Sequence, residues 1–143
     1  MVHKASNDAA VPPPVSRYTH LNSVPADHEL VLISGQVGNL PDGSLAGEDA
    51  QTQAAQVFAN IEALLRGIGA TPAHLLKFTS FVVGRESLAA FREARDRSFD
   101  AWYPEGTPVP GHTLAIVAGL ADPRLLVEVE AVAAVPRAAQ PTD

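Results

Sequence analysis

Two carboxylates near the C-terminal end of the chain have a spacing that suits acid–base chemistry. Glu128 and Glu130 alternate with Val127 and Val129, and because side chains alternate across a strand, both carboxylates lie on one face. If that face lines a cleft, a carboxylate there could position a water molecule for attack on an electrophilic carbon. The alternative is an ordinary strand with a solvated glutamate face. Glu128 is therefore a candidate catalytic residue, and Glu130 is a candidate substrate-binding residue.

Two polar residues come directly before an apolar segment upstream of the glutamates. His112 and Thr113 come just before the apolar residues 114–117. An imidazole with a reference pKa of about 6.5 is mostly neutral at pH 7, so His112 would offer a ligand a hydrogen bond without a full charge. We predict that His112 and Thr113 contact a substrate. The alternative for His112 is a half-exposed position at a strand edge or at a subunit interface.

Three further candidates lie in the first quarter of the chain. Ser34 and Gly35 follow the apolar residues 30–33. Ser34 is not part of a Gly-x-Ser-x-Gly turn, so we interpret it as a residue that orients a ligand or bonds the backbone, not as a nucleophile. Gly35 favours close packing, and Tyr18 either closes a pocket or packs as an ordinary tyrosine. All three are predicted substrate-binding residues.

The composition excludes several kinds of chemistry. The chain has no cysteine, which excludes thiolate nucleophiles, disulfides and cysteine-ligated metals. The common glycine-rich phosphate-binding motifs are absent, and His-Glu-x-x-His does not occur. No metal-ligand spacing is shared by His3, His20, His28 and His74. We therefore predict no metal and no cofactor.

Length and charge restrict the partners. The 143 residues suit a single domain. A net charge of −6, from 16 acidic and 10 basic residues, disfavours a nucleic-acid partner because phosphate binding needs a basic patch. No apolar run reaches the roughly 18 residues of a membrane span, and the first residues lack the apolar core of a signal peptide. We expect a cytoplasmic protein without a membrane partner.

Alternating strands and helices must position these side chains. Residues 1–15, which end in three prolines, are expected to form a disordered or extended arm, and residues 136–143 a C-terminal tail. Between them, residues 16–135 are expected to form one domain. Periodicity and turn residues predict two helices, at 50–68 with Asp49 as the cap and at 88–103 with Ser87 as the cap, and strands at 18–22, 29–37, 75–83, 112–118 and 125–135.

The order β-β-α-β-α-β-β indicates an α+β fold with both helices on one face of a mixed sheet. Two helices cannot cover both faces of such a sheet. The other face is therefore expected to be covered by oligomerisation, since it would otherwise be a large apolar patch.

This element order and several segments together resemble the Rid/YjgF family of reactive intermediate deaminase-like proteins. The resemblance spans about residues 18–135. It implies a chorismate-mutase-like protomer and a homotrimer in which the sheets form a barrel, with sites in clefts between subunits. The segments that carry it are Ile33-Ser34-Gly35-Gln36, the strand with Lys77, the helix ending near Phe99, and Val127-Glu128-Val129-Glu130-Ala131.

When the site residues of the family are assigned to positions of this sequence, one of them differs. Where imine deaminases of the family carry an arginine that binds a substrate carboxylate, this chain carries His112. Losing a charge-assisted contact costs about 1.5–3 kcal/mol, which lowers affinity about tenfold or more. The arginines that could compensate are Arg17, Arg92 and Arg124. The functional glutamate of the family corresponds to Glu128.

The resemblance implies a homotrimer that binds small metabolites of the 2-imino or 2-oxo acid type. It further implies hydrolysis of enamine or imine intermediates to keto acids and ammonia. One alternative is a non-catalytic small-molecule-binding or pathway-accessory trimer. Another is an RNA-cleaving inhibitor of translation initiation, a role attached to some relatives, which the charge of −6 disfavours.

Overall fold

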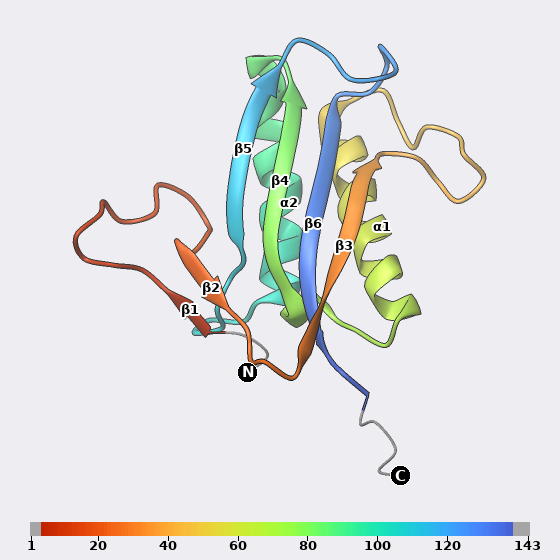
Figure 1. Cartoon of the computed structure of the whole chain (residues 1–143). Helices are drawn as coiled ribbons and strands as arrows, with labels where there is room; N and C mark the ends of the chain where they lie inside the picture. The colour runs from red at the N-terminus through yellow and green to blue at the C-terminus, as the bar shows by residue number, and fades with distance from the viewer. Residues whose placement is uncertain (1–3, 139–143) are drawn as a thin grey trace.

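A computed structural model describes residues 4–138 of the chain. Residues 1–3 of the predicted arm and 139–143 of the predicted tail lie outside this range. Single 3-10 turns precede β4 and α2, at Pro72–His74 and Arg85–Ser87. The elements, in chain order, are β1 (Lys4–Ser6), β2 (Leu21–Ser23), β3 (His28–Val37), α1 (Ala50–Gly67), β4 (Leu75–Val83), α2 (Leu88–Trp102), β5 (Gly111–Val117) and β6 (Val127–Pro136) (Figure 1).

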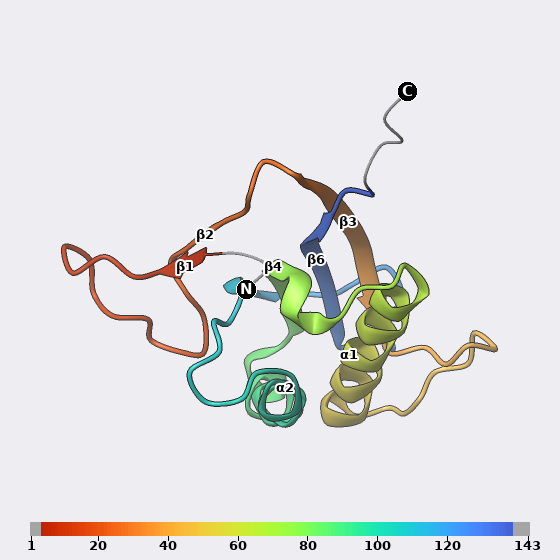
Figure 2. The same cartoon turned by 90° about the horizontal axis from the view of Figure 1, so that it is seen from below.

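The main sheet has the strand order β3-β6-β4-β5, with β4 and β5 parallel and the other pairs antiparallel. The crossover between the parallel strands is α2. Both helices pack on the same face of the sheet, as the view from below shows (Figure 2). The predicted α+β class, with two helices on one face of a mixed sheet, is confirmed.

The last two strands follow each other in sequence but are not neighbours in the sheet. Instead, β6 lies between β3 and β4 and pairs with both. As a result, β3 and β5 form the two edges of the main sheet. The edge strand β3 carries Ser34 and Gly35 and the edge strand β5 carries His112 and Thr113, whereas Glu128 and Glu130 lie on the inner strand β6.

The helix α1 forms as its sequence predicts. The Asp49 side chain accepts a hydrogen bond of 2.8 Å from the Thr52 backbone N–H, which satisfies one of the free donors at the helix start. The apolar stripe is buried against the sheet and consists of Ala54, Val57, Ile61 and Leu65. Gly69, with φ of +73°, follows the helix end and takes a backbone conformation that favours glycine.

Aromatic rings fill the core between the helices and the sheet. Phe58 of α1 is 1% exposed and lies at the centre of this cluster. Its ring centroid is 5.9–6.3 Å from those of four other aromatic side chains, in edge-to-face or tilted arrangements that such rings prefer. These are Phe78, Phe91, Phe99 and Trp102.

A buried amide fixes the start of β6. Gln53 is fully buried, and its side chain donates to the carbonyl oxygens of Gly47 at 3.0 Å and Arg124 at 2.9 Å. It also accepts from the Leu126 N–H at 2.8 Å. A buried polar group needs such partners. Gln53 therefore holds the chain two residues before Glu128.

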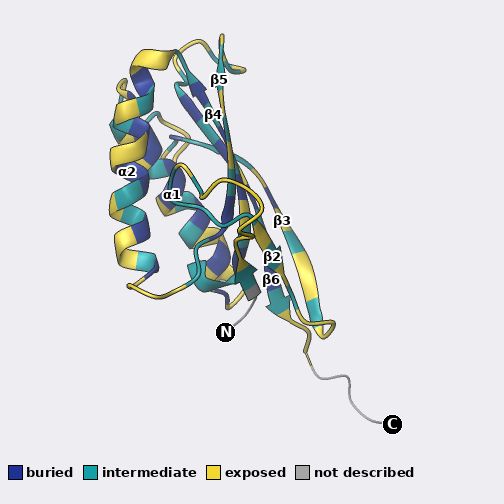
Figure 3. Ribbon diagram, turned by 90° about the vertical axis from the view of Figure 1, so that its left-hand side faces the viewer, coloured by how far each residue is buried: buried dark blue, intermediate teal, exposed yellow. Residues whose placement is uncertain are grey.

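The sheet face opposite the helices is uncovered in a single chain. Leu30 and Leu32 of β3 are 63% and 78% exposed on it, and β3 runs along the outer side of the molecule in Figure 3. Exposed apolar side chains on a sheet face are typical of an interaction surface. The trimer stays a prediction that this face supports.

The N-terminal region differs in detail from the prediction. The first strand of the domain is Leu21–Ser23, not residues 18–22, and Lys4–Ser6 of the expected arm pair with it as an antiparallel ribbon. This pairing joins segments about fifteen residues apart, and the periodicity of a short polar segment does not reveal it.

Ser87 is the N-cap residue of the second helix, as predicted, but its side chain does not cap the helix. Ser87 forms no side-chain capping hydrogen bond, because the preceding 3-10 turn already gives it a helical backbone with φ of −82° and ψ of −12°. A capping side chain needs an extended backbone at that position. The turn begins after Gly84, whose φ is +75°.

Candidate functional site

The Glu128 carboxylate lies directly over Gly35. A Cβ atom placed on Gly35 would lie 2.9 Å from Cδ and 3.0 Å from Cγ of Glu128, and closer still to a carboxylate oxygen. Gly35 does not have a positive φ, so space, not backbone conformation, requires glycine here. The strand register of β3 shifts between Ile33 and Gln36, and the resulting bulge places Gly35 beside the carboxylate.

The Glu128 carboxylate forms no hydrogen bond or ion pair with other residues in 4–138, and its side chain is half-buried. Its acceptor positions are therefore available to a water molecule or a ligand. The structure brings together two of the predicted site residues, Gly35 and Glu128, with Ser34 in the same bulge.

Glu130 lies on the same uncovered face as Glu128 but lines a pocket with other residues. It lines a shallow pocket of about 320 Å³ together with Ser34, Lys77 and Thr79. The strand register continues across the sheet from Glu130 to Thr79 and Thr113. Lys77 donates a hydrogen bond of 2.8 Å to Thr113 Oγ1. The predicted residues Ser34, Glu130 and Thr113 thus share the uncovered face of the sheet.

His112 faces the opposite side of the sheet, toward α2. Its Nε2 is 2.8 Å from Ser80 Oγ, and its ring centroid is 6.0 Å from that of Phe78 and 6.3 Å from that of Phe91. β4 separates β5 from β6, and the register aligns His112 with Ala131, three residues from Glu128. Two strand spacings, about 10 Å across the sheet, and about 10 Å along the strand therefore separate His112 from Glu128. Within one chain, the structure does not bring them together.

The environment of His112 favours the neutral imidazole. Burial, and then the positive charges of Arg95 and Lys77, lower the pKa of His112 from 6.5 to about 4. A cationic form would have to lie in an apolar site close to two other cations. At neutral pH the side chain is therefore an uncharged hydrogen-bonding group.

This lowered pKa predicts a pH-dependent stability. Between pH 6.5 and 4 the unfolded chain binds a proton at His112 that the folded chain does not, so the contribution to stability is complete above 6.5 and is lost as pH falls through 4. We expect the wild type to lose up to about 3 kcal/mol more than His112→Gln between pH 7 and 4. Urea unfolding at both pH values measures this, and parallel losses in the two proteins would contradict it.

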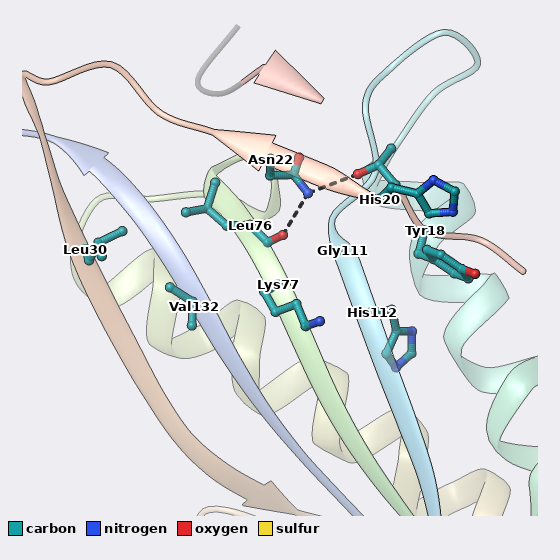
Figure 4. A pocket seen from close by; sticks show the side chains of 10 residues that line it. Tyr18, His20, Asn22, Leu30, Leu76, Lys77, Gly111, His112 and Val132 are labelled. Carbon is teal, nitrogen blue, oxygen red and sulfur yellow. Dashed lines mark hydrogen bonds between the residues drawn. The ribbon is translucent and has the colours of Figure 1, made fainter. Parts of the chain in front are cut away.

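Tyr18 is positioned by hydrogen bonds between the N-terminal segment and the chain before β5. The Thr19 N–H donates to the Pro110 carbonyl at 3.2 Å, and Thr19 Oγ1 donates to the Val109 carbonyl at 2.8 Å. Tyr18 and His112 then line two adjacent pockets of about 380 and 330 Å³. Figure 4 shows the first of them, with Tyr18 and His112 on one side, Leu30 and Val132 on the other, and Lys77 between.

Two of the three compensating arginine candidates are already paired. Arg17 binds the Asp100 carboxylate at 2.7 Å, and Arg124 binds the Asp122 carboxylate at 2.8 Å. The latter pair lowers the pKa of Asp122 to about 2, mainly through hydrogen bonds from Arg124. Arg92 lines the smaller Tyr18–His112 pocket, and its guanidinium forms no ion pair or hydrogen bond with residues 4–138.

Arg95 is a site residue that the sequence reasoning missed. It is 4% exposed, lines the same pocket as Arg92 and donates to Ser16 Oγ at 3.1 Å. Its guanidinium also binds the Asp96 carboxylate at 2.9 Å. A signal was present, since Arg95 lies four residues from both Phe91 and Phe99 and therefore on the buried side of the helix.

The candidate residues are thus not brought together at one place in a single chain. Two groups are separate: Tyr18, His112 and Arg92 lie at the β5 edge of the sheet, and Gly35 and Glu128 lie at the β3 side. The uncovered face between these groups carries Ser34, Glu130 and Thr113. Within residues 4–138, no group of three or more metal-binding side chains lies together. No helix in this range is long and apolar enough to cross a membrane.

The chain was compared with protein families and with known proteins. Residues 9–135 match the family described as endoribonuclease L-PSP. AldR of Lactococcus lactis subsp. lactis (strain IL1403) is 31% identical over 107 residues, which cover 74% of this chain and 79% of AldR.

Two solved structures are similar over almost the whole fold. The Rid-family protein YyfB from Yersinia pestis, of unknown function, is 29% identical with a TM-score of 0.81, covering 94% of this chain and all of YyfB. RidA from the Antarctic bacterium Psychrobacter sp. PAMC 21119 is 27% identical with a TM-score of 0.63, covering 92% of this chain and 99% of RidA. The resemblance read from the sequence is confirmed: the chain belongs to the endoribonuclease L-PSP family, which includes the Rid/YjgF proteins.

Proposed function

We propose that the protein is a homotrimer that binds 2-imino or 2-oxo acids in clefts between subunits and hydrolyses enamine or imine intermediates. The observation that carries this proposal is the Glu128 carboxylate, which lies over Gly35 with its acceptor positions free. A half-buried carboxylate of this kind is suited to general-base catalysis.

The division of the candidate residues supports a site between subunits. His112 and Tyr18 lie at the β5 edge, and Gly35 and Glu128 lie at the β3 side, so a single chain holds two incomplete halves. A head-to-tail ring places the β5 edge of one chain beside the β3 edge of the next. The exposed Leu30 and Leu32 would then be covered inside the ring.

The reaction follows from the residues in this cleft. Glu128 accepts a proton from water as the water oxygen forms a bond to the imine carbon, and the C=N double bond becomes a single bond. Glu128 passes that proton to the nitrogen, which gives a carbinolamine. Glu128 then takes the hydroxyl proton and returns it to the nitrogen as C=O forms and the C–N bond breaks, so that ammonia and the keto acid leave and the carboxylate is regenerated. An enamine first becomes an imine by protonation at carbon. Tyr18 and Thr113 line the cleft as substrate-binding residues in this proposal.

The direct test is ammonia release from enzymatically generated 2-aminoacrylate, with buffer alone and an authentic Rid-family deaminase as controls. We expect release above the uncatalysed rate, together with a trimer in sedimentation. A 15.0 kDa chain that sediments as a stable monomer, and that leaves the ammonia rate unchanged, would contradict the proposal.

A second candidate function is non-catalytic binding of a small metabolite. It is favoured by His112, which stands where the resemblance expects an arginine and is held neutral against Ser80. Binding of a 2-oxo acid without any ammonia release would select this alternative. RNA cleavage is not part of the proposal, since the net charge of −6 disfavours phosphate binding.

A further inference from the structure

The pocket between α2 and the N-terminal segment is lined by two arginines. Its volume is about 330 Å³, and its polar lining residues are Ser16, Tyr18, Arg92, Arg95 and His112. Arg92 and Arg95 are three residues apart on α2, which places them on neighbouring positions of one helix side. The Asp96 carboxylate, 2.9 Å from Arg95, already balances one of these charges, so an anion is favoured beside Arg92.

The two arginines differ in what they already bind. Arg95 is buried, and its guanidinium is shared between the Asp96 carboxylate and Ser16 Oγ. Arg92 is exposed, and within residues 4–138 its guanidinium has no partner. Arg95 therefore fixes the shape of the pocket and brings its own counter-charge. Arg92 retains a free two-pronged donor of the geometry that matches a carboxylate.

His112 supplies the other end of the pocket. Its Nε2 is occupied by Ser80 Oγ, and Nδ1 forms no hydrogen bond with any residue in 4–138. Because the ring is neutral at pH 7, Nδ1 suits an uncharged polar group better than a carboxylate. The pocket thus has one charged end on α2 and one uncharged polar end on β5.

We propose that Arg92 binds the carboxylate of the ligand and that His112 Nδ1 contacts an uncharged polar group of the same molecule. The carboxylate anchor of this chain then comes from the helix α2, not from the strand β5, and determines specificity for acids over neutral carbonyl compounds. This inference rests on the proposed function for the ligand class, but its test does not require catalysis.

The test compares binding of 2-oxobutyrate and of neutral 2-butanone by calorimetry. Arg92→Gln should weaken 2-oxobutyrate binding about tenfold or more, because a charge-assisted contact is lost, and should leave 2-butanone unaffected. Arg97→Gln is the matched control, since Arg97 is exposed on the same helix and pairs with Glu93 instead. It should bind 2-oxobutyrate as the wild type does.

A second variant keeps the positive charge at position 92 but removes the two-pronged donor. Arg92→Lys should bind 2-oxobutyrate more tightly than Arg92→Gln and less tightly than the wild type. Equal affinities of Arg92→Lys and Arg92→Gln would contradict a charge-assisted contact. Circular dichroism confirms that each variant is folded.

The outcomes separate this inference from the proposed function. Unchanged 2-oxobutyrate affinity in Arg92→Gln, or no binding of 2-oxobutyrate by the wild type, overturns the inference. Arg92-dependent binding without ammonia release from 2-aminoacrylate supports the inference and contradicts the proposed hydrolase activity. Where ammonia is released, Arg92→Gln should raise KM with a smaller change in kcat, whereas loss of Glu128 should lower kcat.

Discussion

Glu128→Gln is expected to lower the rate of ammonia release from 2-aminoacrylate by about 10²-fold or more, because general-base catalysis typically contributes a factor of 10² to 10⁴. The amide keeps the size of the side chain over Gly35 but cannot accept a proton from water. The rate is measured by following the ammonia released over time, either in samples quenched at intervals or in a coupled assay. Affinity for 2-oxobutyrate should change little.

A variant that leaves the carboxylate intact tests its position. Gly35→Ala would place a methyl group where the Glu128 carboxylate lies, so the side chain must move and the rate should fall although the base is present. Glu48→Gln, an exposed glutamate before α1, serves as the control and should be fully active. Normal rates in both Glu128→Gln and Gly35→Ala would exclude Glu128 as the base.

Phe58→Ala is expected to lower the free energy of unfolding by about 3–5 kcal/mol, as large-to-small changes in a packed core do. The ring is 1% exposed and lies beside four aromatic side chains, three from α2 and one from β4. Since small domains have only about 5–15 kcal/mol of stability, the variant should be close to unfolding. Urea denaturation of the variant and the wild type gives the difference.

The control for this variant is Leu64→Ala on the same helix. Leu64 is 46% exposed, so its truncation should cost about 1 kcal/mol or less. A loss below that value for Phe58→Ala would mean that the aromatic cluster does not form the centre of the core.

The local sequence was sufficient to predict the helices and strands that bury one regular row of apolar side chains. Helix α1 could be predicted because Ala54, Val57, Ile61 and Leu65 recur at helical spacing, and all four are buried. The strand β4 has the bounds that its apolar sequence predicts. Pairing between distant segments could not be predicted this way, as the ribbon of β1 and β2 shows.

The candidate site was harder to predict because it depends on the face of the sheet to which each side chain points. Alternation correctly placed Glu128 and Glu130 on a common face, but the sequence does not say that His112 points to the other one. That orientation is set by the register of β5 on β4 and by contacts with Phe91 of α2. Arg95 was missed although its spacing from Phe91 and Phe99 indicated the buried side of the helix, because arginine is rarely buried and the sequence does not show that Ser16 lies beside it.

The placement of the two groups of candidate residues on opposite sides of the sheet has a genetic consequence. In a head-to-tail ring, every cleft combines the β5 edge of one chain with the Gly35–Glu128 side of its neighbour. Two inactive alleles, one defective in each half, would then complement each other when co-expressed. Random mixing restores an intact pair of halves in roughly a quarter of the clefts. Alleles defective in the same half would fail to complement, so the proposed ring predicts that mutations of this gene fall into two complementation groups.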